Sequence, residues 1–73
     1  MQNEHPNILE IIADNVKKIR HQQQISQEEL SFRSGLNKNY ISAIECARRN
    51  LSMQSLVKLA QGLEVKVIDL LEE

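Results

Sequence analysis

The sequence predicts an all-α domain of five short helices. Its 73 residues include only 2 Gly and 1 Pro, and the frequent residue types (Leu, Ile, Glu, Gln, Lys and Arg) favour helices over strands. Apolar residues recur at spacings of three and four, which is the period of one helix face. An average domain has about 150 residues, so residues 1–73 are expected to form a single domain.

Each helix is predicted from its own local signals. Helices are expected at residues 8–21, 27–33, 38–45, 53–61 and 65–71. The first four follow good N-cap residues, namely Asn7, Ser26, Asn37 and Ser52. Glu10 and Glu29 stand three residues after two of these caps, as in a capping box. Gly35 and Gly62 are expected to end the second and fourth helices. Residues 1–6 are polar and are expected to be flexible.

The hydrophobic core must be aliphatic, because the chain has one Phe, one Tyr and no Trp. The residues predicted to form it are Val16, Ile19, Leu30, Leu36, Ile41, Ile44, Leu56, Leu59 and Leu63. A chain of this size buries only about 60% of its unfolded surface, so a second copy or a partner is expected to add stability.

Several classes of protein are excluded. No apolar run approaches the ~18 residues of a membrane span, and no signal peptide is apparent, so a cytoplasmic protein with no membrane partner is expected. The single cysteine, Cys46, fits a reducing compartment and is interpreted as a passive thiol. His5 and His21 lack metal-ligand spacing, so no metal is expected. No cofactor is expected either, and the lack of a ligand-binding domain argues against a small-molecule ligand. No nucleophile–base pair or phosphate-binding loop indicates an enzyme.

The net charge of −1 conceals an uneven distribution of charge. Residues 17–58 contain eight basic and three acidic residues, whereas the two ends together contain one basic and seven acidic residues. A polyanionic partner is therefore possible if the basic segment forms one face.

Residues 27–45 carry the functional signal, because a short helix, a turn with Gly and a second short helix describe a helix-turn-helix unit. Ser31 is the small residue needed where the two helices approach, and Gly35 tolerates positive φ in the turn. Apolar residues join the helices to the domain: Leu30, Leu36, Ile41 and Ile44. The outer face of the second helix can then enter a major groove, and its residues are Asn37, Lys38, Asn39, Tyr40, Ser42 and Ala43.

At these residues the sequence resembles a known family. The segments that carry the resemblance are Ser26-Gln27-Glu28-Glu29-Leu30, Ser34-Gly35-Leu36 and Tyr40-Ile41-Ser42-x-Ile44-Glu45, with Asn15-Val16-x-x-Ile19-Arg20 before them and Arg49-Asn50-Leu51-Ser52 after them. They are similar to the phage repressor/Cro-type helix-turn-helix family over residues 12–71, and most of all to restriction–modification controller proteins. The resemblance implies a lambda-repressor-like DNA-binding domain in which the second and third helices form the motif.

The resemblance also implies residue roles. Residues assigned to reading base edges are Lys38, Asn39, Ser42 and Ala43. Residues assigned to the DNA backbone are Gln27, Asn37, Tyr40, Arg48, Arg49 and Asn50. Arg20 and Glu45 match a structural ion pair. Two assignments have open alternatives, because Tyr40 could instead cover the turn and Arg48 could be an ordinary solvated charge.

Three positions depart from the family pattern. Gln24 stands where Gly usually ends the first helix, so that turn is expected to be reshaped or strained. Ser31 replaces the usual Ala, and Lys66 replaces the usual cap of the last helix.

The predicted function is sequence-specific regulation of transcription by a homodimer bound to an inverted-repeat DNA operator. Apolar residues beyond the motif core are assigned to the dimer interface: Leu51, Val65, Val67, Leu70 and Leu71. Alternatively, these residues complete the core of a monomer. A second reading of the function is an antitoxin or another protein-interaction module, although an antitoxin usually needs an extension that binds its toxin.

Overall fold

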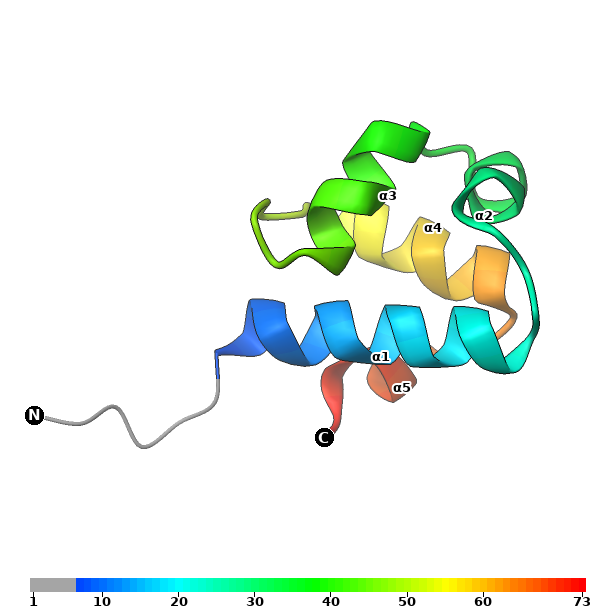
Figure 1. Ribbon diagram of the computed structural model, residues 1–73. Coiled ribbons are helices and arrows are strands. Elements are labelled where there is room, and N and C mark those ends of the chain that lie inside the picture. Colours follow the sequence, from blue (N-terminus) through cyan, green and yellow to red (C-terminus); the bar gives the residue numbers. More distant parts are fainter. Residues whose placement is uncertain (1–6) are drawn as a thin grey trace, which may run out of the picture.

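The computed structural model describes residues 7–73, and within that range it contains five α-helices and no strand, as the sequence predicts (Figure 1). The helices are α1 (Ile8–Gln22), α2 (Gln27–Ser34), α3 (Lys38–Glu45), α4 (Met53–Leu63) and α5 (Val67–Leu71). The segment 1–6, expected to be flexible, lies outside the described residues. No helix of residues 7–73 is long and apolar enough to span a membrane.

Helix α1 is the central element of the arrangement. It packs against α3 on one side and against α5 on the other, and α2 packs against both α3 and α4 (Figure 1). The helix-turn-helix pair therefore lies on one side of α1, and the end of the chain lies on the other.

The predicted helix starts are confirmed by the caps. The side chains of Asn7, Ser26, Asn37 and Ser52 each accept a hydrogen bond from a backbone N–H in the first turn of the helix that follows. These bonds satisfy donors that have no partner inside the helix, which is why Asn and Ser are favoured there. The last helix begins at Val67 rather than at residue 65. Its start is fixed by the Asp69 carboxylate, which accepts from the Lys66 N–H at 2.9 Å.

Gly62 does not end α4, contrary to the sequence prediction. The helix continues to Leu63, and Glu64 follows it in the left-handed conformation at φ 60°. Gly62 is buried against α2, where an added Cβ would lie 3.1 Å from Cβ of Ser34 and 3.2 Å from Cδ1 of Leu30. The glycine is needed for close packing of two helices and not for its backbone freedom.

Two further turns use left-handed residues that are not glycine. Gln24 has φ 59° and Ala47 has φ 57°. Their backbone N–H groups bond back to the ends of α1 and α3, reaching His21 O and Ile44 O. The turn after α1 therefore keeps a left-handed geometry without Gly, and the Cβ of Gln24 introduces strain of about 1–2 kcal/mol.

The aliphatic core is largely as predicted. Seven of its expected members are buried, namely Val16, Leu30, Ile41, Ile44, Leu56, Leu59 and Leu63. Ile19 and Leu36 are only partly buried and pack against the edge of that cluster. The sequence prediction omitted Ile12, Ala60 and Leu70, all of which are buried in it.

Candidate nucleic-acid interface

The turn between α2 and α3 is held by the side chains that precede it. The Ser31 hydroxyl donates to the carbonyl oxygen of Leu36, and Ser34 Oγ accepts from the Leu36 N–H at 3.2 Å. Gly35 lies between them at φ 77°, in the left-handed region. Ser31 therefore adds a hydrogen bond across the turn, which the alanine usual at this position could not make.

The N-terminal half of α3 projects into solvent. Ile41 and Ile44 are buried beneath the helix, whereas Lys38 and Asn39 are exposed. Ser42 and Ala43 are half-buried one turn later. The structure therefore places the four predicted base-reading residues along one short helix that is anchored from below.

Asn37 is committed to capping this helix. Its Oδ1 accepts from the Asn39 N–H at 2.7 Å, while the residue remains exposed. Asn37 therefore stands at the N-terminus of α3, the end at which the helix dipole attracts a phosphate group.

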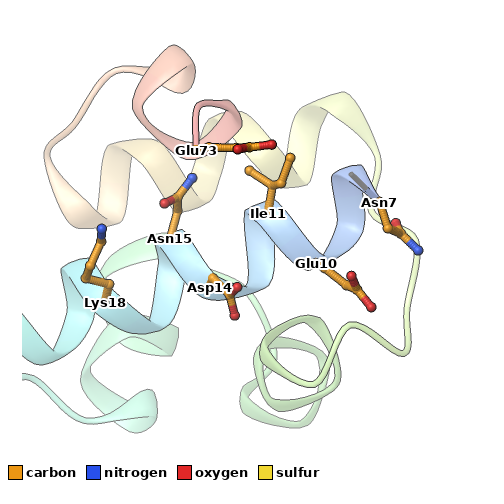
Figure 2. Close-up of a pocket in the computed structure, with 7 residues that line it drawn as sticks. All are labelled: Asn7, Glu10, Ile11, Asp14, Asn15, Lys18 and Glu73. Carbon is orange, nitrogen blue, oxygen red and sulfur yellow. The ribbon is translucent and has the colours of Figure 1, made fainter. Parts of the chain in front are cut away.

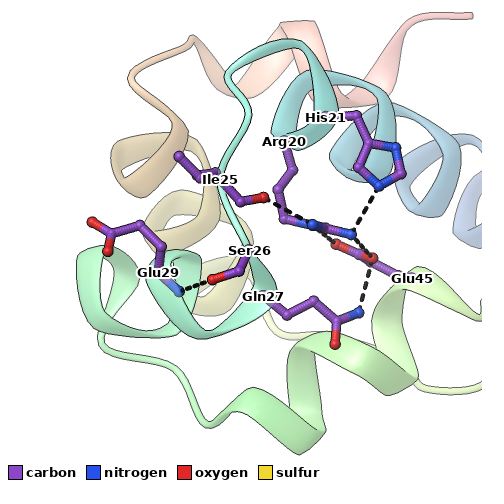
Figure 3. A network of polar contacts seen from close by, with 7 residues as sticks. All are labelled: Arg20, His21, Ile25, Ser26, Gln27, Glu29 and Glu45. Atoms are coloured by element: carbon purple, nitrogen blue, oxygen red, sulfur yellow. Dashed lines mark hydrogen bonds and ion pairs between the residues drawn. The ribbon is translucent and has the colours of Figure 1, made fainter.

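Arg20 and Glu45 form the predicted ion pair, and it joins α1 to the end of α3 (Figure 3). Arg20 Nε donates to Glu45 Oε2 at 2.8 Å, and Arg20 Nη2 donates to Glu45 Oε1 at 3.0 Å. The Arg20 side chain is 11% exposed and the Glu45 side chain 4% exposed. Hydrogen bonding to Glu45 raises the pKa of Arg20 above its ordinary value, and the two parallel bonds make the pair a buried bidentate bridge.

Gln27 extends this network to the start of α2. Its Nε2 donates to Glu45 Oε1 at 3.0 Å, and Arg20 Nη1 donates to the Ile25 carbonyl at 2.9 Å (Figure 3). Three helices are thus tied together at one carboxylate. The side chain of Gln27 is consequently held in place at the N-terminus of α2, which is where a DNA phosphate is expected.

Tyr40 is anchored to α4 by its hydroxyl. Tyr40 Oη donates to Ser55 Oγ at 3.1 Å, and the guanidinium carbon of Arg49 lies 5.1 Å from the centre of the Tyr40 ring. This places Arg49 within cation–π distance. Tyr40 therefore joins α3 to α4 through its hydroxyl and to the loop after α3 through its ring.

The positive surface is smaller than the charge count implied. Arg20 is buried in its ion pair, and Arg33 bonds Glu29 at 3.0 Å on the surface of α2. The cations next to α3 are Lys38, which begins it, and Arg48 and Arg49, which follow it. Arg48, Arg49 and Asn50 are all exposed.

The residues assigned to the dimer interface are not equally available. Leu70 is fully buried inside the chain, so its side chain cannot contact a partner, and the sequence prediction is wrong there. Four others are half-buried against the core, namely Leu51, Val65, Val67 and Leu71. Sequence reasoning missed Ile68, which is 50% exposed. Helical spacing could have revealed it, because a residue two positions before a buried leucine lies on the opposite helix face.

Other candidate chemistry is sparse. Cys46 is a free, exposed thiol. Within residues 7–73, no three His, Cys, Asp or Glu side chains are grouped so that they could hold a metal ion.

Comparison with known proteins agrees with this geometry. A family model described as helix-turn-helix matches residues 16–70. The chain belongs to this helix-turn-helix family. Among relatives of this helix-turn-helix protein, the control protein C.SmaI of Serratia marcescens is 40% identical over 65 residues, which span 89% of this chain and 77% of C.SmaI.

Solved structures give the same picture. The restriction–modification controller protein C.AhdI of Aeromonas hydrophila superposes with a TM-score of 0.82 at 32% identity, covering 85% of this chain and 94% of C.AhdI. C.Esp1396I bound to a 19-base-pair DNA duplex superposes with a TM-score of 0.81 at 37% identity, covering 89% of this chain and 87% of that one. The helix-turn-helix chain therefore shares the fold of these controller proteins over the 85% and 89% of its length that the two superpositions cover.

Proposed function

We propose that this chain is a sequence-specific, double-stranded DNA-binding regulator of transcription that acts as a homodimer on an inverted-repeat operator, as a restriction–modification controller protein. The observation that carries the proposal is the exposed N-terminal half of α3, held in a helix-turn-helix and followed by two exposed arginines, Arg48 and Arg49. The likeness to C.Esp1396I bound to DNA supports it. We infer that the chain acts as one domain in the cytoplasm and that it does not catalyse a reaction.

Base recognition is assigned to the exposed side chains of α3. Lys38 can donate to guanine O6 and N7, and Asn39 can form two hydrogen bonds with adenine. Each such contact is worth about 1–3 kcal/mol of discrimination. Ser42 and Ala43 lie one turn further along, where a hydroxyl and a methyl group can contact base edges.

Affinity is assigned to the residues that flank α3. Arg48, Arg49 and Asn50 form an exposed loop after the helix, and Gln27 and Asn37 stand at the two helix N-termini. Contacts from such groups to phosphates fix the register of a protein on DNA and make binding dependent on salt.

A homodimer is needed because one helix-turn-helix covers only a few base pairs. Two recognition helices about 34 Å apart read both halves of an inverted repeat. The proposed dimer surface consists of half-buried or exposed apolar side chains, namely Leu51, Val65, Val67, Ile68 and Leu71. Acidic residues adjoin it at Glu64, Asp69, Glu72 and Glu73, and they disfavour DNA binding by that face.

A DNA titration tests the function. Duplexes enriched from a random pool by the parent chain are titrated by fluorescence anisotropy at 50 and 200 mM salt. If the dimer contacts 6–10 phosphates, affinity should fall by about 10³–10⁵ between these concentrations. A chain that binds enriched and random duplexes equally, or that binds none, contradicts the proposal and favours a protein-interaction module.

Sedimentation tests the dimer surface. Ile68→Asp places a charge on an exposed position of α5, so it should shift the chain from dimer to monomer at tens of micromolar without unfolding it. Phe32→Asp is the matched control, because Phe32 is an 83% exposed apolar residue on α2. Equal sedimentation of all three chains would show that α5 is not the interface.

A further inference from the structure

We propose that Asn15 is a positioning residue for assembly: its side chain holds the end of α5 and so sets the dimer surface relative to the recognition helix. The inference rests on the homodimer proposed above. Asn15 lies on α1, outside both the DNA-contacting residues and the dimer surface.

The contacts of Asn15 reach the last residues of the chain. Its Nδ2 donates to the Leu70 carbonyl oxygen at 3.0 Å and to the Glu72 carbonyl oxygen at 2.6 Å. Asn15 is 8% exposed. Figure 2 shows its side chain directed from α1 toward the C-terminal segment, beside Glu73. One amide group thus donates to two carbonyls, that of Leu70 in α5 and that of Glu72, the residue just after the helix.

Helix α5 needs such a partner because it is only five residues long. Helices far shorter than ~12 residues are marginal without outside support. The carbonyl groups of the last turn also find no N–H donor within the helix. A buried carbonyl therefore needs a donor from elsewhere. Apolar side chains hold α5 to the core, Leu70 fully buried and Val67 and Leu71 half-buried, but apolar contacts are not directional. The two directed hydrogen bonds from Asn15 fix its orientation.

Asn15 and Arg20 act on opposite sides of α1. Their separation of five residues places them about 140° apart around the helix. Arg20 holds Glu45 of α3, whereas Asn15 holds α5, and α1 lies between the two (Figure 1). The position of the recognition helix relative to α5 is therefore transmitted through α1. In a two-fold dimer, that relative position decides the separation of the two recognition helices.

The test measures α5 and assembly separately. Asn15→Ala removes both hydrogen bonds, and Asn15→Asp places a carboxylate against two carbonyl oxygens. Ser34→Ala is the matched control, because Ser34 is also 8% exposed but bonds Leu36 in the α2–α3 turn. Amide hydrogen exchange is followed at Glu72, whose N–H bonds Ile68, and at the amides of α3, with self-association measured by sedimentation equilibrium.

For both Asn15 variants, exchange at Glu72 should accelerate at least tenfold more than exchange in α3, and the dimer dissociation constant should rise at least tenfold. Ser34→Ala should neither accelerate exchange at Glu72 relative to α3 nor raise the dimer dissociation constant. Should the Asp variant fail to fold, the Ala variant decides the outcome alone.

Four results would overturn the inference. Equal acceleration in α5 and α3 would mean that Asn15 stabilises the chain only globally. Faster exchange in α5 with an unchanged dimer dissociation constant would show that Asn15 has no role in assembly. An equal loss of dimer in Ser34→Ala would show the same. A parent chain that is monomeric at every concentration refutes the homodimer and with it the role in assembly, and the exchange data still decide whether Asn15 holds α5.

Discussion

Removing the Glu45 carboxylate tests how strongly the helix-turn-helix is held to α1. Glu45→Ala deletes the acceptor of three hydrogen bonds, two from Arg20 and one from Gln27. The Arg20 guanidinium then stays in a largely buried site, still charged, with only the Ile25 carbonyl and the His21 ring beside it. An unpaired buried charge is among the costliest defects a fold can carry.

The expected loss is about 3–5 kcal/mol of unfolding free energy. A chain of 73 residues has a total of roughly 4–11 kcal/mol, at about 0.05–0.15 kcal/mol per residue. Glu45→Ala should therefore unfold the domain at much lower urea concentration, which circular dichroism at 222 nm measures directly. The burial of both side chains decides this magnitude, because the same pair at the surface would contribute only about 0–1 kcal/mol.

Two controls sharpen this prediction. Glu29→Ala removes the partner of Arg33 in an exposed pair on α2 and should cost only about 0.3–0.5 kcal/mol. The double variant Arg20→Met with Glu45→Leu replaces both charges by apolar groups and should recover much of the lost stability. If Glu45→Ala cost no more than Glu29→Ala, the bridge would not hold α3 to α1 and the reasoning would be refuted.

Three further variants test other parts of the fold by urea melting. Ile44→Ala should cost about 2–5 kcal/mol because it leaves a cavity in the core under α3; an unchanged midpoint would count against the packing. Ala47→Gly should stabilise the chain by about 1 kcal/mol because it relieves a left-handed Cβ, and a loss of stability would show that this turn is unstrained. Tyr40→Phe should cost about 0.5–1.5 kcal/mol through the lost bond to Ser55 while Arg49 keeps its ring, and a neutral result would argue that the hydroxyl bonds water instead.

Much of the fold could be predicted because its signals are local. Asn7 and Ser26 cap the helices that they precede, and Gly35 adopts the positive φ of the turn. Such features depend on a few neighbouring residues, so a single sequence contains them. The ion pair of Arg20 and Glu45 joins distant segments, and only the resemblance to a family pointed to it.

The errors arise where tertiary packing decides. Gly62 was expected to stop a helix, yet it lies inside α4 because α2 approaches there too closely for a side chain. Leu70 was expected at the dimer surface, yet it is buried beneath α1. The two hydrogen bonds from Asn15 to carbonyl groups span more than fifty residues of sequence, and no local sequence pattern predicts them. In each case the deciding neighbour is remote in the chain.

The central claim is that α3 contacts base edges while the loop after it contacts the DNA backbone. The most direct measurement compares affinities for the enriched operator and for a set of its single-base variants, using the parent, Lys38→Ala, Asn39→Ala and Arg49→Ala. Lys38→Ala and Asn39→Ala should each flatten discrimination at specific positions, by about 1–3 kcal/mol. Arg49→Ala should weaken binding to all variants alike and lower the salt slope by about one. Unchanged base preferences in both α3 variants would contradict the account.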